Sequence, residues 1–264
     1  MAKSYETLRL EVLDEHLLAV TMNRPEVRNA LNTQMGRDML ELFSGLAADP
    51  GPCRCVVLTG AGDKAFCAGG DLKERRGMTQ ERWQAQHAIF ERMTLAIVDC
   101  PIPIIAAVNG AAYGGGTELV GAVDFAYAST EARFALTEVT LGIMPGAAGT
   151  QTLPRSLGAR RAKEIIFTGL PFSAEEALQW GFVNKVTAPE ALMAETLKTA
   201  RRIAGNAPLS IRQAKKSIHF GQQMDLRTAM FFEIEAYNRL VDTADRHEGV
   251  LAFNEKRRPV FKGR

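Results

Sequence analysis

The sequence predicts an α/β fold, in which parallel strands alternate with helices that cover a sheet. Through the first half of the chain, short apolar runs alternate with longer segments whose apolar residues recur at helical spacing. A glycine triplet at 114–116 joins a strand-like run at 103–108 to a helix-compatible segment, as expected of a tight turn after a strand. Beyond residue 150 helical patterns dominate, so a helical region is expected to follow the sheet.

The N-terminal segments predict a hairpin followed by a helix. Residues 5–12 and 16–22 alternate apolar and polar side chains around a charged turn, which is typical of two antiparallel strands. Residues 33–48 predict an amphipathic helix, and the Pro-Gly-Pro sequence at 50–52 ends it. The apolar stripe of that helix consists of Met35, Met39, Leu42, Phe43 and Leu46.

The central segments repeat the order of strand and helix, which is the pattern of parallel βαβ units. The expected elements are a strand at 53–59, a Gly-rich loop at 60–71, a helix at 79–98, a strand at 103–108, a helix after the glycine turn, and a strand at 125–128. Helices are expected afterwards at 159–168, 173–180, 189–205, 208–222 and 225–254.

Composition and charge narrow the classes of function. The 264 residues fit one large domain, or a core with an appended subdomain. The formal net charge is only +2, from 32 basic and 30 acidic residues, which argues against a dedicated nucleic-acid surface. No apolar run is long enough to span a membrane, and no signal or transit peptide is recognised. A cytoplasmic protein, or a mature form without its targeting segment, is therefore expected.

The cysteines and histidines predict neither a disulfide framework nor a metal site. The four cysteines form no CxxC pair, and their expected role is that of buried apolar groups. The histidines, which are His16, His87, His219 and His247, are scattered, and none is expected to be a ligand. Complete GxGxxG, GxxxxGK[ST] and GxSxG sequences are also absent, which argues against dinucleotide, P-loop and α/β-hydrolase chemistry.

Two Gly-rich loops carry the predicted chemistry. The first runs from Lys64 to Leu72 and the second from Gly114 to Glu118, and each follows a strand. Ligands of open α/β sheets bind beyond the carboxyl ends of the strands, so both loops are expected on the same side. Each loop can offer a free N–H, and two such donors can hold one oxygen that gains negative charge.

Glu118 and Glu138 are the candidate acid–base residues. Glu118 directly follows the glycine triplet and its threonine, and Glu138 lies in a largely apolar stretch. Two paired carboxylates can perform general acid–base chemistry, with their roles divided by their environments. Taken alone, Glu138 is better interpreted as the N-terminus of a helix capped by Thr137, and only its pairing with Glu118 favours a catalytic role.

Several segments, in their order along the chain, resemble the crotonase (enoyl-CoA hydratase/isomerase) superfamily. The first are Asn23-Arg24-Pro25 with Asn29-Ala30-Leu31, and Ala65-Phe66-Cys67-Ala68-Gly69-Gly70-Asp71-Leu72-Lys73. They continue with Ala107-Val108-Asn109-Gly110, Gly114-Gly115-Gly116-Thr117-Glu118-Leu119, Phe134 to Glu138, Leu141-Gly142-Ile143-Met144-Pro145-Gly146 with Gly149-Thr150-Gln151, and Phe253-Asn254-Glu255-Lys256-Arg257. The resemblance extends over nearly the whole chain.

The resemblance implies a spiral of ββα repeats over residues 1–195, which carries the active site, and a C-terminal helical trimerisation or lid region over residues 196–264. It implies a homotrimer or a dimer of trimers. The implied substrate is an acyl-CoA thioester, and no separate cofactor is expected because coenzyme A is part of the substrate. The oxyanion hole of the family maps to the backbone N–H groups of Gly70 and Gly115.

The acid–base pair of the hydratases maps to Glu118 and Glu138, twenty positions apart as in those enzymes. The implied reaction is the reversible addition of water to a trans-2-enoyl-CoA, which gives a 3-hydroxyacyl-CoA. By resemblance, Glu118 orients and activates water, and Glu138 manages the proton that reaches the α-carbon. Isomerisation of an enoyl-CoA and hydrolysis of the thioester are the alternatives on the same fold.

The resemblance also suggests residues that contact coenzyme A. Arg28 and Lys73 are candidates near phosphate or adenine, with solvated surface charge as the alternative for both. The loop that contains Lys73 is expected to line the site through Ala68, Gly70, Asp71, Leu72 and Lys73. The basic tail from Lys256 to Arg264 is either a further phosphate contact or a solvated tail. Ala147-Ala148 stand where many hydratases have more glycine.

Leu72-Lys73-Glu74-Arg75 and Lys163-Glu164-Ile165-Ile166-Phe167 also resemble the methylglutaconyl-CoA hydratase branch of the superfamily. That branch includes an RNA-binding member with a Lys-rich first helix. The helix at 33–48 of this chain carries Arg37 and no lysine, so no binding of nucleic acid is expected.

Overall fold

Two sheets form the body of the protein in the computed structural model, which describes residues 4–264. The larger sheet has the order β1-β2-β3-β5-β7-β10, formed by Leu8–Asp14, Leu17–Met22, Cys55–Gly60, Ile104–Val108, Phe125–Ser129 and Lys185–Thr187. The smaller sheet has the order β4-β6-β8-β9, formed by Ala65–Cys67, Ala111–Tyr113, Arg133–Ala135 and Phe172–Ser173. The strands β1 and β2 pair antiparallel, as the hairpin pattern predicts, and the other pairs of the larger sheet are parallel.

Each turn of the chain contributes one strand to each sheet. The strands β3, β5 and β7 lie in the larger sheet, and each is followed by a short strand of the smaller sheet, β4, β6 or β8. A helix comes after each of these pairs, which gives the ββα repeat implied by the sequence resemblance. The Gly-rich loop predicted at 60–71 therefore contains a strand, Ala65–Cys67.

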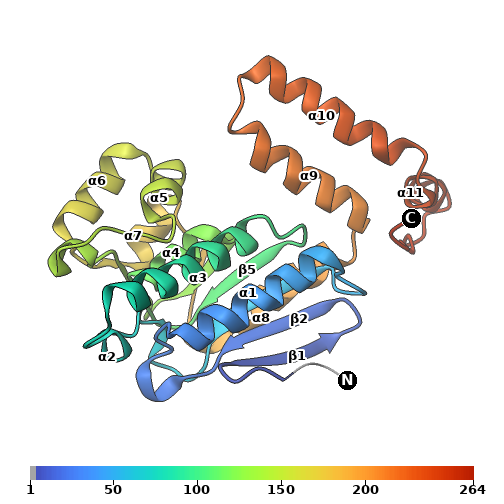
Figure 1. The fold of residues 1–264 in the computed structure, drawn as a ribbon. Helices are drawn as coiled ribbons and strands as arrows, with labels where there is room; N and C mark the ends of the chain where they lie inside the picture. Colours follow the sequence, from blue (N-terminus) through green and yellow to red (C-terminus); the bar gives the residue numbers. More distant parts are fainter. Residues whose placement is uncertain (1–3) are drawn as a thin grey trace.

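Helices cover both faces of the larger sheet (Figure 1). They are α1 (Thr33–Ala48), α2 (Leu72–Arg75), α3 (Gln80–Val98), α4 (Gly115–Ala122), α5 (Gly149–Leu157), α6 (Ala159–Thr168), α7 (Ala174–Gln179), α8 (Pro189–Ala204), α9 (Pro208–Gly221), α10 (Leu226–Val241) and α11 (Ala244–Asn254). The helices α1 and α3 pack against each other, and α8 packs against β3, β5 and β7. In residues 4–264 no helix is both long and apolar enough to cross a membrane.

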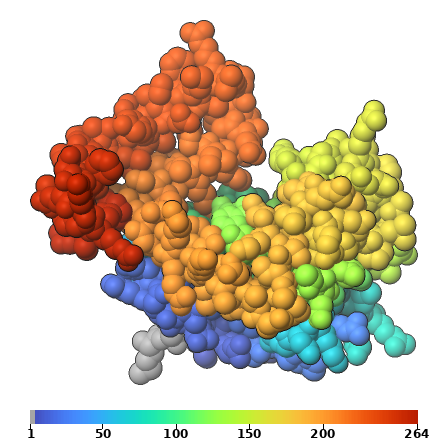
Figure 2. All heavy atoms as spheres, turned by 180° about the vertical axis from the view of Figure 1, so that it is seen from behind, coloured from blue at the N-terminus to red at the C-terminus, as the bar shows by residue number. Residues whose placement is uncertain are grey.

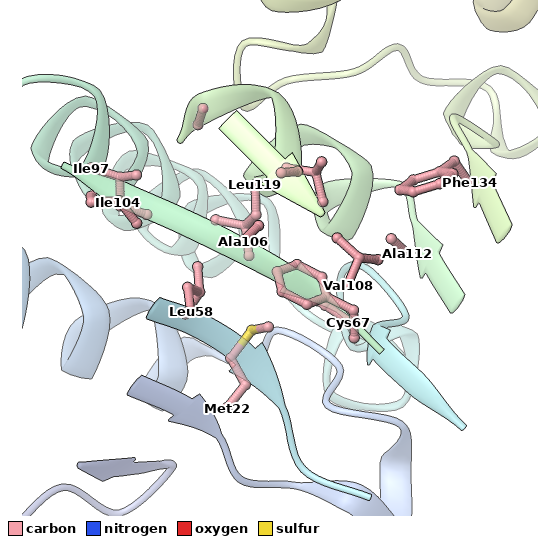
Figure 3. Packing of buried hydrophobic residues seen from close by; sticks show 14 of the residues in the cluster. Met22, Leu58, Cys67, Ile97, Ile104, Ala106, Val108, Ala112, Leu119 and Phe134 are labelled. Atoms are coloured by element: carbon pink, nitrogen blue, oxygen red, sulfur yellow. The ribbon is translucent and has the colours of Figure 1, made fainter. Parts of the chain in front are cut away.

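The strand β5 is buried on both faces, which is why its sequence is continuously apolar. Ile104, Ala106 and Val108 face the larger hydrophobic cluster, whereas Ile105 and Ala107 face a second cluster that includes side chains of α8. Figure 3 shows side chains of α3 and α4 lying over β5 in the first cluster, with Ile97 near Ile104 and Leu119 near Ala106. This packing fixes the end of β5, from which the glycine turn leads into α4.

The C-terminal helices carry many exposed apolar side chains. The helices α9 and α10 pack against each other and stand apart from the lobe formed by α5, α6 and α7 (Figures 1 and 2). Leu226 on α10 is 78% exposed and Phe253 on α11 is 83% exposed. The boundary predicted between residues 195 and 196 falls within α8, and both this division and the trimerisation role remain predictions.

Candidate active site

A cavity of about 470 Å³ lies where the two predicted Gly-rich loops meet. Of the residues predicted from the sequence, six line it: Ala68, Gly70, Leu72, Gly115, Glu118 and Glu138. Three predicted residues do not line it: Arg28, Asp71 and Lys73. The fold therefore brings both glutamates and both candidate oxyanion donors to one cavity.

The two oxyanion candidates lie on loops that touch each other. Leu31 donates its N–H to the carbonyl of Gly69 at 2.7 Å and accepts from the N–H of Asp71 at 2.9 Å, which holds the first loop extended around Gly70. Gly69 has φ of 88°, and an ideal Cβ on it would lie only 2.6 Å from the carbonyl oxygen of Tyr113, so only glycine permits this approach to the second loop. Gly115 begins α4, where backbone N–H groups lack helical partners.

Glu118 is held by backbone donors. Its Oε1 accepts hydrogen bonds from the N–H groups of Ala147 and Gly149, both at 2.8 Å, and the residue is 4% exposed. Burial raises the pKa of Glu118, and these two N–H donors act against that shift. An ideal Cβ on Gly149 would lie 3.0 Å from Oε1, so glycine allows the donor to reach the carboxylate.

Glu138 lines the same cavity and is half-buried. Burial raises its pKa to about 7, and the nearby charge of Glu118 adds to the shift. Its Oε2 is buried without a hydrogen-bond partner in the protein, which suits a carboxyl group that exchanges a proton with a ligand. The residue begins a short 3-10 helix, Glu138–Leu141, with Thr137 at its N-cap position, as the structural alternative predicts, but the side chain of Thr137 makes no capping hydrogen bond.

Asp71 stabilises the first Gly-rich loop. Its carboxylate caps α2 by accepting from the N–H groups of Lys73 and Glu74 at 3.1 and 3.2 Å. It also pairs with Arg24 at 3.0 Å and is 7% exposed. Its predicted contact with coenzyme A remains a prediction, as do those of Arg28 and Lys73, which are exposed.

Ala148 is strained beside the site. It caps the N-terminus of α5 with φ of 79°, in the left-handed region that disfavours a side chain with a Cβ. We expect Ala148→Gly to raise the free energy of unfolding by about 1 kcal/mol, measured by denaturant unfolding. Ala188→Gly is the matched control, because Ala188 is also an N-cap but has φ of −58°. An equal effect of the two changes would contradict strain at Ala148.

The cavity is also lined by side chains that were not predicted as site residues, among them Arg75, Trp83 and His87. His87 was not expected to be a ligand. Its ring lies against Gly146, since an ideal Cβ on Gly146 would lie 2.7 Å from Cε1 of His87. Its Nε2 lies 3.2 Å from Glu91. The helical pattern at 79–98 predicts α3 well, but only the packing of α3 against the 137–147 segment shows which residues of α3 reach the cavity.

Comparison with known proteins agrees with this geometry. The family model described as enoyl-CoA hydratase/isomerase matches residues 13–264. The chain belongs to this family. A short-chain-enoyl-CoA hydratase of Clostridium acetobutylicum is 40% identical over 250 residues, which cover 93% of this chain and 94% of that protein. A crotonyl-CoA hydratase of Syntrophomonas wolfei is 38% identical and covers 98% of both chains.

Solved structures confirm the crotonase-type fold of this family member. An enoyl-CoA hydratase from Bacillus anthracis superposes with a TM-score of 0.96 at 41% identity, over 98% of this chain and all of that one. The family and the predicted α/β spiral are therefore confirmed, and the protein is an enzyme of the enoyl-CoA hydratase type.

Proposed function

We propose that this protein hydrates trans-2-enoyl-CoA thioesters to 3-hydroxyacyl-CoA thioesters, with Glu118 and Glu138 as the acid–base pair. The observation that carries the proposal is the meeting of two glutamates in one cavity beside the N–H groups of Gly70 and Gly115. The relatives named as hydratases support the same reaction.

The proposed mechanism begins at the thioester carbonyl. Its oxygen accepts from the N–H groups of Gly70 and Gly115, which stabilise the negative charge that forms as the β-carbon is attacked. Glu118, fixed by two backbone donors, orients water and takes its proton as the oxygen bonds to the β-carbon. Glu138 gives a proton to the α-carbon. After turnover Glu118 releases the proton that it took from water and Glu138 regains one, so both carboxyl groups return to their starting states. One water is consumed, and one C–O and one C–H bond replace the π-bond.

The raised pKa of Glu138 predicts that hydration slows as the pH rises. Hydration needs Glu138 protonated, so kcat/KM for crotonyl-CoA should fall as pH rises through about 7. Dehydration of 3-hydroxybutyryl-CoA should show the same fall, because that direction needs Glu118 protonated and the equilibrium constant of a reaction without net proton uptake does not depend on pH. A kcat/KM for hydration that did not fall through about 7 would contradict this role, and the residual activity of Glu138→Gln should lack the step.

Further parts of the proposal concern coenzyme A and assembly. Arg28 and Lys73 are exposed near the first loop, and we infer that they approach the phosphates or adenine of the bound thioester. We also infer a trimer or a dimer of trimers, in which the exposed apolar side chains of α9, α10 and α11 are covered by neighbouring subunits. A cytoplasmic location is part of the same proposal.

The proposed reaction is tested by the loss of enoyl-thioester absorbance on adding crotonyl-CoA. Hydration predicts rapid loss and the appearance of 3-hydroxybutyryl-CoA. Product analysis separates the alternatives, because an isomerase converts a 3-enoyl-CoA without adding water and a hydrolase releases free coenzyme A. Unchanged crotonyl-CoA at high enzyme concentration would contradict hydration of short enoyl chains.

A further inference from the structure

A positive charge lies within the active-site cavity. Arg75 is the last residue of α2, and its side chain lines the cavity together with Gly70, Trp83 and Glu138. An ideal Cβ on Gly70 would lie 3.1 Å from Nη1 of Arg75, so the guanidinium lies beside a predicted oxyanion donor. A cavity for purely apolar acyl chains gains nothing from a cation, whose removal from water is costly.

The guanidinium is fixed by contacts that use only part of its hydrogen-bonding capacity. Nε donates to Oε1 of Gln86 at 2.9 Å, and Cζ lies 4.5 Å from the centre of the Trp83 ring. Gln86 is buried, and its Nε2 donates to Thr33 and Glu74, which sets the direction of its acceptor oxygen. In the described part of the chain, Nη1 and Nη2 of Arg75 donate to no protein acceptor.

Among residues 4–264 no carboxylate forms an ion pair with Arg75. Glu74 accepts from the N–H of Thr33 and from Gln86, so its carboxylate is engaged elsewhere. Glu138 is close enough for its charge to act on the pKa of Arg75, but no hydrogen bond joins the two side chains. Burial lowers the pKa of Arg75, yet a guanidinium keeps its proton in proteins. The cavity therefore holds a cation whose two Nη groups are free to donate.

We propose that Arg75 binds a carboxylate on the acyl part of the substrate, so that the preferred enoyl-CoA carries a second, acidic end. This inference rests on the proposed hydration and adds the class of acyl group. The two Nη donors on one edge of a guanidinium match the two oxygens of a carboxylate. Trp83 and Phe90 flank the guanidinium, and such an apolar setting strengthens a charged pair.

The test compares two thioesters that differ only at the far end of the acyl group. Pent-2-enedioyl-CoA ends in a carboxylate, and 5-methylhex-2-enoyl-CoA has two methyl groups in place of the carboxylate oxygens. Because both carry coenzyme A, any contact of Arg75 with a CoA phosphate cancels in the ratio of their kcat/KM values. We expect the wild-type protein to prefer the acidic thioester by roughly 10- to 100-fold, as a charged hydrogen-bonded pair gives.

Substitutions at position 75 should change this ratio. Arg75→Met removes the charge but keeps an extended side chain, and we expect it to abolish the preference for the acidic thioester. Arg75→Lys keeps the charge without the planar fork and should retain part of the preference. Arg76→Met is the matched control, because Arg76 is exposed and does not line the cavity. For this variant the ratio of the kcat/KM values with the two thioesters should equal that of the wild type.

Two results would overturn the inference. One is a wild-type protein that shows no preference for the acidic thioester. The other is Arg75→Met activity that falls equally with both thioesters, with a common shift of the pH profile, because Arg75 would then act through Glu138 or coenzyme A.

Absence of hydration with both thioesters would refute the proposed function but still leave this inference testable. Calorimetry then compares the saturated pair, pentanedioyl-CoA and 5-methylhexanoyl-CoA. Tighter binding of the acidic compound that Arg75→Met abolishes would support the inference, and equal binding would overturn it.

Discussion

Glu138→Gln is expected to lower kcat for hydration of crotonyl-CoA by roughly 10²- to 10⁴-fold, the usual contribution of a general acid. Glutamine has nearly the same shape but cannot deliver a proton to the α-carbon. Because Oε2 of Glu138 has no hydrogen-bond partner in the protein, the substitution breaks no protein contact of that oxygen. The loss should therefore appear in kcat, measured by steady-state kinetics, and not in the free energy of unfolding.

Glu118→Gln is the companion variant. An amide oxygen can still accept from the N–H groups of Ala147 and Gly149, so the local structure should persist while the base is lost. The double variant should be little worse than either single one, since residues that act as a unit are not additive. Full activity in both single variants would refute the acid–base assignment.

Gly115→Val is expected to lower kcat by roughly 10²- to 10³-fold, the cost of losing an oxyanion donor. An ideal Cβ at Gly115 would lie 3.0 Å from Cδ1 of Leu31, and the added methyl groups must occupy space beside the N–H that holds the carbonyl. The carbonyl is then displaced from its donor. The measurement is kcat together with Kd for a saturated acyl-CoA.

The matched control is Gly45→Val on α1, because both glycines are helical and a Cβ at Gly45 would meet nothing within 4 Å. Both substitutions place a β-branched residue in a helix, which has the same small effect on helix stability in the two variants. If Gly115→Val retained wild-type kcat, the carbonyl would have to bind elsewhere in the cavity.

Long, periodic elements could be predicted from the sequence almost to the residue. The helix α1 spans Thr33–Ala48, as its apolar stripe predicts. The strands β4, β6 and β8 were missed because three residues are too short to show a period.

The helix predicted at 225–254 is in fact two helices, α10 and α11. The break lies before Thr243, whose hydroxyl accepts from the N–H of Arg246 as the N-cap of α11. A Thr within an otherwise helical pattern is a signal that could have located this break.

The site was predicted where chemistry and local sequence coincide, and missed where it depends on packing. The glycine triplet identifies the turn that presents Glu118, and the twenty-residue spacing identifies Glu138 only through family resemblance. The donors to Glu118 come from Ala147 and Gly149, and Arg75 reaches the cavity through Gln86 and Trp83. No spacing in the sequence shows these contacts, because they depend on how α2, α3 and α5 approach the loops.

Turnover of crotonyl-CoA in heavy-oxygen water, followed by mass spectrometry of the thioester, tests the proposed hydration most directly. We expect 3-hydroxybutyryl-CoA with one heavy oxygen at the β-carbon, formed by the wild-type protein and at greatly reduced rate by Glu118→Gln and Glu138→Gln. Label in free crotonate with release of coenzyme A, or thioester recovered without label, would contradict it.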